Sequence, residues 1–334
     1  MQRTLLNQAL SILNGGGVVG IPTETVYGLA ARVDIPGAIH QVFEKKGRPK
    51  DHPLIVHIGD RSLLTQYARE IPAYVSLLIE KFWPGPLTLL LKKTEKVPDS
   101  VTGGQDSVAI RMPNHPLTLS LLQSFNVGVV APSANRFMQV SPTTARHVKE
   151  SLGEDLFVLD GGACQVGIES TILDVRDPLK AVILRPGMVT REALESVLSS
   201  EGVSVRYREE ASVSPKVSGD HPKHYSPRKP MVLLSHPKLF PELLVKLAKE
   251  RGENVGIYLL SFGFSEEFSQ IYQQLAGYFV LHDMPTQPEA YAKALYQALH
   301  EADDSRAEVI VLEAPPKTSE WVAIWDRLSR AVSP

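Results

Sequence analysis

The sequence has little of several features that would assign it to a specialised class. Its 334 residues include one cysteine, Cys164, so no intramolecular disulfide can form, which favours a reducing compartment. No run approaches the roughly 20 apolar residues that span a bilayer, and the N-terminus has no signal-peptide pattern. The formal net charge of -2 argues against a surface devoted mainly to nucleic acid or an anionic membrane. We therefore expect a cytoplasmic protein without membrane partners.

Length and pattern predict two domains joined by a linker. Residues 1–202 mix strands with helices, and residues 231–334 alternate strand and helix, which indicates a smaller parallel, Rossmann-like α/β domain. Between them, residues 203–230 are rich in proline and serine and show no periodic apolar pattern, which is typical of a linker. The fold class we expect is α/β.

Periodicity also predicts the individual elements. In the first domain we expect helices at residues 5–13, 37–46, 63–68, 72–82, 117–125 and 190–198, and strands at 18–22, 54–58, 87–91, 107–113, 127–131, 156–159, 166–175 and 181–187. In the second we expect strands at 231–234, 255–260, 278–282 and 308–312, and helices at 241–251, 264–275, 288–303 and 320–328.

Three predictions concern helix starts. Residues 22–29 are expected to form a turn followed by a helix that Thr23 or Thr25 caps. Ser141 is expected to cap a helix that has Pro142 in its first position, and Thr190 to cap another.

A basic loop leads into a short apolar strand, through Lys46, Gly47, Arg48, Pro49 and Lys50. Arginine offers a planar fork of donors and lysine a compact charge, so this loop could hold phosphate. A solvated basic turn is an equally good interpretation of this loop taken alone.

Other loops of the first domain also carry polar groups that could converge on one site. Arg111 and Arg185 end strands, small hydroxyl groups follow several strands, and the main carboxylates are Glu24 and Glu169. We find no cluster with metal-ligand spacing, no Ser-His-Asp pattern and no Walker loop. A site rich in arginine and serine suits a reaction driven by positioning and charge neutralisation, such as nucleotidyl transfer from ATP.

Eight motifs in order make the resemblance to a known family specific. They are Pro-Thr-Glu-Thr-Val-Tyr-Gly, Lys-Gly-Arg-Pro, Pro-Leu-Ile-Val-His, Trp-Pro-Gly-Pro-Leu-Thr, Arg-Met-Pro, Pro-Ser-Ala-Asn, Glu-Ser-Thr-Ile and Leu-Arg-Pro-Gly. The chain resembles the YrdC-type threonylcarbamoyl-AMP synthase family in its long, two-domain form. That resemblance implies a twisted mixed sheet with helices around a concave site in the first domain. It also implies a nucleotidyltransferase that condenses L-threonine, bicarbonate and ATP, for tRNA modification completed by a threonylcarbamoyl transfer complex.

The resemblance also implies site residues, none of them catalytic in the strict sense. L-Threonine would be bound by Thr25, His57, Arg111, Ala131, Ser170 and Thr171. ATP would be bound by Lys46, Arg48, Lys50, His52, Ser107, Ser133, Asn135, Ser141, Arg185 and Tyr225. Mg²⁺ would accompany ATP, although no set of carboxylates in the sequence identifies its protein ligands, and the linker would close over the nucleotide as a lid.

Three alternatives remain at this point. The first is a module that binds double-stranded RNA or tRNA without chemistry, which the basic loops favour and the balanced charge does not. The second is a carbamoyl-adenylate enzyme with a different acceptor, and the third is a regulatory domain that has lost activity.

Overall fold

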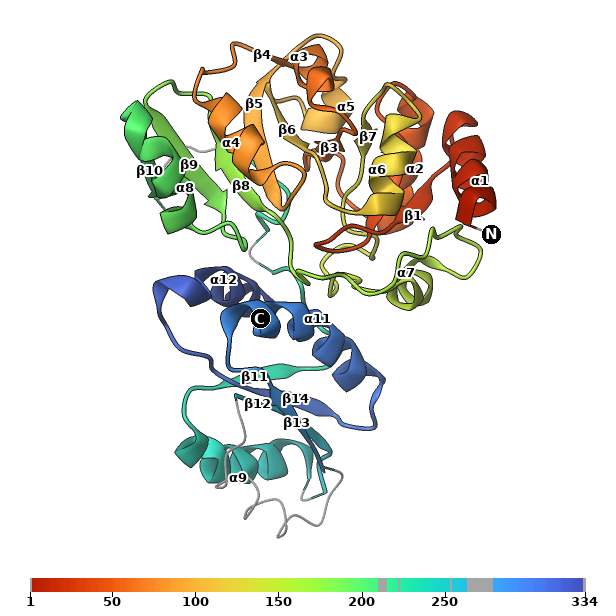
Figure 1. Ribbon diagram of the computed structural model, residues 1–334. Coiled ribbons are helices and arrows are strands. Elements are labelled where there is room, and N and C mark those ends of the chain that lie inside the picture. Colours follow the sequence, from red (N-terminus) through yellow and green to blue (C-terminus); the bar gives the residue numbers. More distant parts are fainter. Residues whose placement is uncertain (1, 210–214, 222, 253, 263–278, 333–334) are drawn as a thin grey trace. The chain divides into compact units, whose positions relative to one another are not determined.

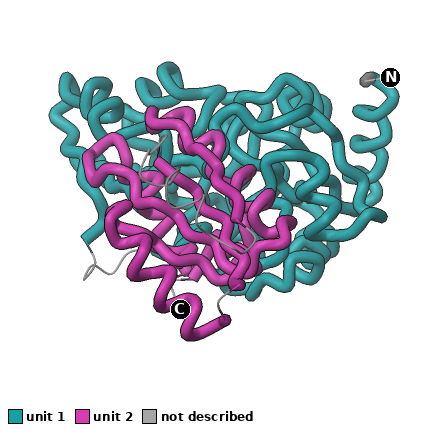
Figure 2. The backbone as a smooth tube through the Cα atoms, turned by 90° about the horizontal axis from the view of Figure 1, so that it is seen from below, with its two compact units in different colours: residues 1–137, 141–220 teal, residues 138–140, 221–334 magenta. Residues whose placement is uncertain are grey.

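The computed structural model describes residues 2–209, 215–221, 223–252, 254–262 and 279–332. These form two compact units, coloured separately in Figure 2. Unit 1 comprises residues 1–137 and 141–220, and unit 2 comprises residues 138–140 and 221–334. Within the described residues, no helix is long and apolar enough to cross a membrane.

Unit 1 holds most of the secondary structure (Figure 1). Its elements, with η for a 3-10 helix, are α1 (Gln2–Asn14), β1 (Val19–Ile21), β2 (Gly28–Arg32), α2 (Pro36–Lys46), β3 (Ile55–His57), η1 (Arg61–Leu63), α3 (Leu64–Tyr67), β4 (Ala68–Arg69), α4 (Val75–Phe82), β5 (Leu87–Lys93), α5 (Asp99–Thr102), β6 (Ser107–Arg111), α6 (Pro116–Gln123), β7 (Val129–Val130), α7 (Ala145–Leu152), β8 (Thr171–Asp174), β9 (Lys180–Arg185), α8 (Arg191–Leu198), η2 (Ser199–Glu201) and β10 (Ser204–Tyr207).

The strands of unit 1 form one mixed sheet, as the resemblance implies. Its order is β1-β2-β7-β3-β6-β5-β8-β9-β10, with β4 paired to β5 outside this path. The pairs β3 with β6, β5 with β8 and β9 with β10 are parallel, and the other pairs are antiparallel. The last strand, β10, lies inside the segment that the sequence assigns to the linker.

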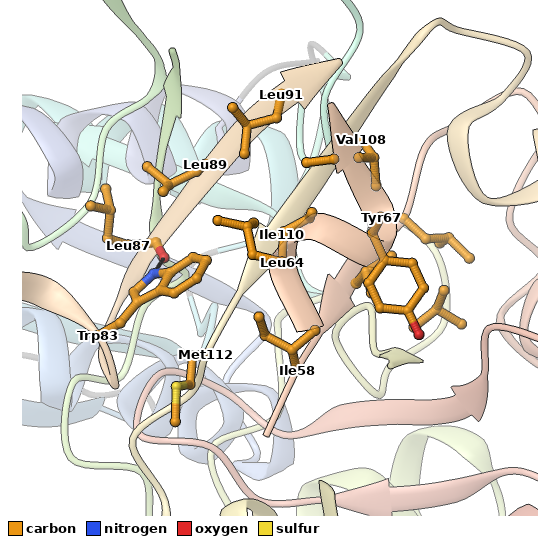
Figure 3. Close-up of a cluster of buried hydrophobic side chains, with 14 of the residues drawn as sticks. Ile58, Leu64, Tyr67, Trp83, Leu87, Leu89, Leu91, Val108, Ile110 and Met112 are labelled. Atoms are coloured by element: carbon orange, nitrogen blue, oxygen red, sulfur yellow. Dashed lines mark hydrogen bonds between the residues drawn. The ribbon is translucent and has the colours of Figure 1, made fainter. Parts of the chain in front are cut away.

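Alternation along the strands gives this sheet two different faces. One face is apolar throughout and packs into the main core, where Leu87, Leu89 and Leu91 of β5 meet Ile110 of β6 (Figure 3). The other, which we call the second face, carries a small apolar cluster of Ile55, Leu90, Ala109, Ile172, Leu184 and Val217. Its neighbouring positions along the same strands are polar, and they form the site described below.

Unit 2 has the parallel α/β pattern that the sequence predicts. Its elements are β11 (Met231–Leu234), η3 (Pro237–Leu239), α9 (Phe240–Arg251), β12 (Ile257–Phe262), β13 (Phe279–Met284), α11 (Pro288–Asp304), β14 (Val309–Glu313), η4 (Ser319–Trp321) and α12 (Val322–Ala331). The strand order is β11-β14-β12-β13, and all three pairs are parallel. The predicted helix at residues 264–275 lies outside the described residues.

Three local predictions for unit 1 are wrong. After Thr25 the chain forms no helix but enters β2, because the Thr23 hydroxyl accepts from the backbone N–H groups of Thr25 and Val26 and closes a turn. The helix after Ser141 begins at Ala145, and its N-cap is Thr144, whose hydroxyl accepts from the backbone N–H of His147. Residues 156–159 contribute only an isolated bridge, between Val158 and Gly20. The Thr190 cap is confirmed, since its hydroxyl accepts from the Ala193 N–H.

Candidate active site

The register of the sheet brings several predicted residues to one end of its strands, on the second face. His57 lies beside Arg111, because β3 and β6 run parallel and end together. The start of β8 at Thr171 lies beside the start of β5, and the end of β9 at Arg185 lies beside Ile172. We call this end of the strands the Arg111 end. It brings together side chains that lie far apart in the sequence, between Thr25 and Arg185.

Arg111 contacts several other groups at this end of the strands and is almost fully buried. Its guanidinium donates to the Thr25 hydroxyl at 2.8 Å and to the Gly85 carbonyl at 3.2 Å. It also forms an ion pair with Glu24, with 2.6 Å between Nη2 and Oε1. The other Glu24 oxygen accepts from the Asn114 N–H at 3.0 Å. Nε and Nη1 thus each donate one hydrogen bond to protein, whereas Nη2 faces Glu24 as an ion pair without a hydrogen bond, so part of the guanidinium fork remains available to an anionic ligand.

His57 is a neutral hydrogen-bonding group in this setting. Burial, reinforced by the positive charge of Arg111, lowers the pKa of His57 to about 3. Its Nδ1 lies 3.2 Å from the Ile55 carbonyl, which can only accept, so Nδ1 carries the proton. Nε2 is therefore an acceptor, suited to a ligand ammonium or hydroxyl group.

Ser170, Thr171 and Arg185 form the other side of the Arg111 end. The Ser170 hydroxyl lies 2.8 Å from that of Thr88, and its carbonyl accepts from Nε and Nη2 of Arg185 at 3.1 and 2.9 Å. Thr171 donates its hydroxyl to the Val189 carbonyl at 2.8 Å and its N–H to Pro86 at 3.0 Å. The hydroxyl and the N–H of Thr171 therefore both hold neighbouring backbone segments in place.

The basic loop lies near the start of β3, where Arg48 binds the Pro53 carbonyl, and we call this region the Lys46 end. The Lys46 ammonium donates to the carbonyls of Ser133 and Asn135, at 2.5 and 2.6 Å. Arg48 donates to the Pro53 carbonyl at 3.0 Å and lies 5.9 Å from the Phe137 ring centroid. Burial and the nearby Arg48 charge lower the pKa of Lys46 well below its ordinary value. The solvated-turn interpretation is therefore wrong for these two side chains, since both are buried.

The loop that follows β7 is held at two points. Lys46 anchors it at Ser133 and Asn135, as described above. Ser141 is fully buried and donates to the Glu169 carboxylate at 2.5 Å. The negative charge of Glu169 opposes the lowering of the Lys46 pKa in part, so it offsets some of the positive charge at this end. Because the hydroxyl of Ser141 is bonded to this carboxylate, it does not cap the following helix, and Thr144 is the cap instead.

Ser107 opens onto a small pocket between the two ends. The pocket is lined by Pro53, Leu54, Ile55, Leu90, Thr102, Gln105, Ser107, Ala109, Lys216, Val217 and Ser218. Residues 216–218 are fixed here because the Gln105 amide bonds both backbone groups of Lys216 and Arg185 donates to the Ser218 carbonyl at 2.9 Å. Part of the predicted linker thus packs on the second face.

The remaining predicted residues are less central or lie elsewhere. Lys50 is exposed, His52 contacts the Phe137 ring edge-on at 5.3 Å, and Ala131 bonds the Ile55 carbonyl through its N–H. Tyr225 belongs to unit 2.

Sequence reasoning named Glu24 as a candidate site carboxylate without its partner, and it assigned no role to three further groups. Glu24 neutralises Arg111, Thr88 bonds Ser170, and the carbonyls of Gly85 and Pro86 accept from Arg111 and Thr171. The signal for Glu24 was present in its position between two threonines. The Trp-Pro-Gly-Pro turn was interpreted as structural only, and its contacts depend on pairing that the sequence does not display.

The fold and the site together indicate a class of protein. Arg111, Arg185, Lys46 and Arg48 are buried along one face of a mixed sheet, among small hydroxyl groups. The described residues contain no group of three or more side chains suited to holding a metal ion. Such a site binds anionic ligands through preformed charge and hydrogen bonds, as an enzyme using a nucleotide and a small carboxylate would.

Comparison with known proteins identifies the family. Residues 11–187 match the Sua5/YciO/YrdC family model, described as "Telomere recombination", and residues 189–333 match the model "Threonylcarbamoyl-AMP synthase, C-terminal domain". The chain belongs to the Sua5/YrdC family of threonylcarbamoyl-AMP synthases, in its two-domain form. It is therefore an adenylate-forming enzyme of the nucleotidyltransferase type.

Curated relatives and a solved structure cover almost the whole chain. Threonylcarbamoyl-AMP synthase of Bacillus subtilis is 37% identical over 97% of this chain and 92% of its own length. The Pyrococcus abyssi protein of the same name is 36% identical over the same shares. The crystal structure of P. abyssi Sua5 complexed with L-threonine matches with a TM-score of 0.85 and 32% identity, over 99% of this chain and 95% of that one.

Proposed function

We propose that this protein condenses L-threonine, bicarbonate and ATP into L-threonylcarbamoyladenylate and pyrophosphate, for threonylcarbamoylation of tRNA by a partner complex. The amine of threonine attacks bicarbonate and water leaves, which gives a carbamate. A carbamate oxygen then attacks the α-phosphorus of ATP, and pyrophosphate leaves. Both steps join anions, so neutralising and orienting negative charge is the main contribution a protein can make.

The observation that carries the proposal is the Arg111 end. The N–H groups of Arg111 that make no hydrogen bond to protein suit the carboxylate of an amino acid, and the neutral Nε2 of His57 suits its amine or hydroxyl. The P. abyssi relative, which matches nearly the whole chain, was solved with L-threonine. We place threonine at this end, with Thr25 and Ser170 around it and the Ala131 backbone nearby. Thr171 would orient the backbone beneath it.

We place ATP toward the Lys46 end. The residues placed around it are Arg48, Ser107, Ser133, Asn135 and Ser141. Arg185 connects the two ends through Ser170 and Ser218. Lys46 would act chiefly by fixing the loop through the two carbonyl groups it binds. Lys50 and His52 would contact the phosphates from the basic loop, and Tyr225 remains a predicted nucleotide contact.

Mg²⁺ is expected with ATP, and none of its protein ligands is assigned. The described residues contain no group of three or more His, Cys, Asp or Glu side chains that could hold a metal ion, and the carboxylates near the basic loop include Asp51 and Glu169. We therefore propose that Mg²⁺ enters as the ATP complex, and no step is assigned to it.

The RNA-binding alternative is not favoured. A protein that holds a phosphate backbone presents exposed cations. Here Lys46, Arg48, Arg111 and Arg185 are buried and donate to carbonyl and carboxylate groups of the chain itself.

Pyrophosphate release from ATP tests the proposal, with threonine and bicarbonate omitted in turn and the adenylate identified by mass. Release that requires both substrates supports it. Release without threonine would assign a different acceptor, and no release under any condition would refute the synthase activity.

A further inference from the structure

The hydroxyl groups at the Arg111 end differ in where they direct their hydrogens. A hydroxyl has one hydrogen to donate and two lone pairs that accept. Thr171 gives its hydrogen to a backbone carbonyl, as described above. Thr23 gives its hydrogen to the Val26 carbonyl at 2.6 Å, so the donor in the 2.8 Å contact between Thr23 and Thr25 is Thr25. Thr25 and Thr171 have therefore both used their hydrogens on protein groups.

Ser170 is the third hydroxyl at this end, and its contacts have the opposite polarity. Its Oγ lies 2.8 Å from the Thr88 hydroxyl and accepts from Nη2 of Arg185 at 3.1 Å. Within the described part of the chain, the fully buried Thr88 hydroxyl has Ser170 as its one hydrogen-bond partner. If Ser170 were the donor, the Thr88 hydrogen would be buried without an acceptor, which is costly. Thr88 is therefore the donor, both lone pairs of Ser170 are occupied, and the Ser170 hydrogen is available to a ligand.

The position of Thr88 in the sheet places this pair at the threonine site. Thr88 precedes Leu89 of β5, which points into the main core, so the Thr88 side chain points to the second face (Figure 3). Leu89 is paired with Ile110 of β6, so Thr88 lies beside Arg111. Because the one hydrogen of the Thr88 hydroxyl is given to Ser170, its effect on a ligand passes through Ser170.

We infer that Thr88 is a positioning residue for threonine binding, because it keeps the Ser170 hydroxyl in the donor orientation. The inference rests on the proposed function, in which threonine binds at the Arg111 end. Ser170 and Arg111 then supply hydrogen-bond donors for the carboxylate of threonine. Thr25 and Nε2 of His57 supply acceptors for its amine or hydroxyl. This separation of donors from acceptors fixes which way round the amino acid binds.

The test compares Thr88→Val, Thr88→Ser, Ser170→Ala and the double variant Thr88→Val/Ser170→Ala in the full-length enzyme. Thr88→Val keeps the shape of the side chain without its hydroxyl and should raise KM for threonine about 2- to 12-fold, the range of an ordinary neutral hydrogen bond. The values of kcat and of KM for ATP should stay unchanged, since the contact is to bound threonine. Thr88→Ser keeps the hydroxyl and should restore most of the loss. The double variant should match Ser170→Ala alone, because Thr88 acts through Ser170.

Thr94→Val is the matched control, since the Thr94 hydroxyl donates to the Gln66 carbonyl at 2.6 Å just beyond the far end of β5. It should leave both KM values unchanged. An equal rise in KM for threonine with and without Ser170 would overturn the inference, as would a lowered melting temperature with unchanged KM for threonine. If Thr88→Val does not fold, Thr88→Ala removes the same hydroxyl and gives the same comparison. A wild-type enzyme that releases no pyrophosphate would instead refute the proposed function.

Discussion

Replacing Arg111 by methionine separates its part in folding from its part in binding threonine. Arg111 and Glu24 are 4% and 8% exposed, so solvent screens their ion pair little. Arg111→Met leaves the Glu24 carboxylate buried without its cation, and breaking such a pair typically costs about 3–5 kcal/mol. In a unit of this size that corresponds to a fall in melting temperature of about 6–20 °C. The double variant Glu24→Gln/Arg111→Met removes both charges and should recover most of this stability.

Threonine use should not recover with it. In both variants the carboxylate of threonine loses its charge-assisted hydrogen bonds, which are worth about 1.5–3 kcal/mol, or roughly 10- to 150-fold in KM for threonine. KM for ATP should change little, because ATP is placed at the Lys46 end. Thermal unfolding and pyrophosphate release, measured on both variants, give the two quantities. A double variant with normal threonine KM, or an equal rise in both KM values, would refute the assignment of Arg111.

Three further predictions concern single residues of unit 1. The pKa of His57 is about 3 in the folded protein and near 6.5 when unfolded, so the stability present above pH 6.5 is lost as the pH falls towards 3. Between pH 7 and 5, urea unfolding should show the wild type losing about 2 kcal/mol more than His57→Gln; equal losses would contradict this. Burial and the charge of Glu24 raise the pKa of Cys164 to about 12, so its thiol should react with a disulfide reagent only after unfolding. Rapid labelling of the folded protein would show that the thiol is accessible. Thr144→Ala removes the cap of α7 and should cost about 1 kcal/mol in urea unfolding, with unchanged KM values.

The sequence predicted most elements of both units because their apolar patterns have clear periods. The strands of unit 2 are parallel as expected, and Thr190 caps α8 where a lone threonine precedes a helical pattern. These patterns involve residues that are close in sequence, so a short stretch is enough to recognise them.

The wrong cap assignment at Ser141 depends on a partner that is distant in sequence, whereas the turn at Thr23 depends on near neighbours. Ser141 and Thr144 are equally good caps locally, and only Glu169, 28 residues from Ser141, decides between them. The ammonium of Lys46 likewise binds carbonyls 87 and 89 residues further on. Arg111 contacts Thr25 across 86 residues. Such pairings depend on the strand register, which no short motif displays.

The membership of Met138–Val140 in unit 2 has a consequence for how this chain can be divided. These three residues interrupt the loop that carries Ser133, Asn135 and Ser141, and they are bonded to Ser226. A gene shortened after residue 220 would therefore remove more than a separable module, since it would also release the middle of this loop from its backbone partner. Any change in the conformation of residues 221–226, such as a ligand of unit 2 could cause, would likewise reach that loop through the polypeptide itself.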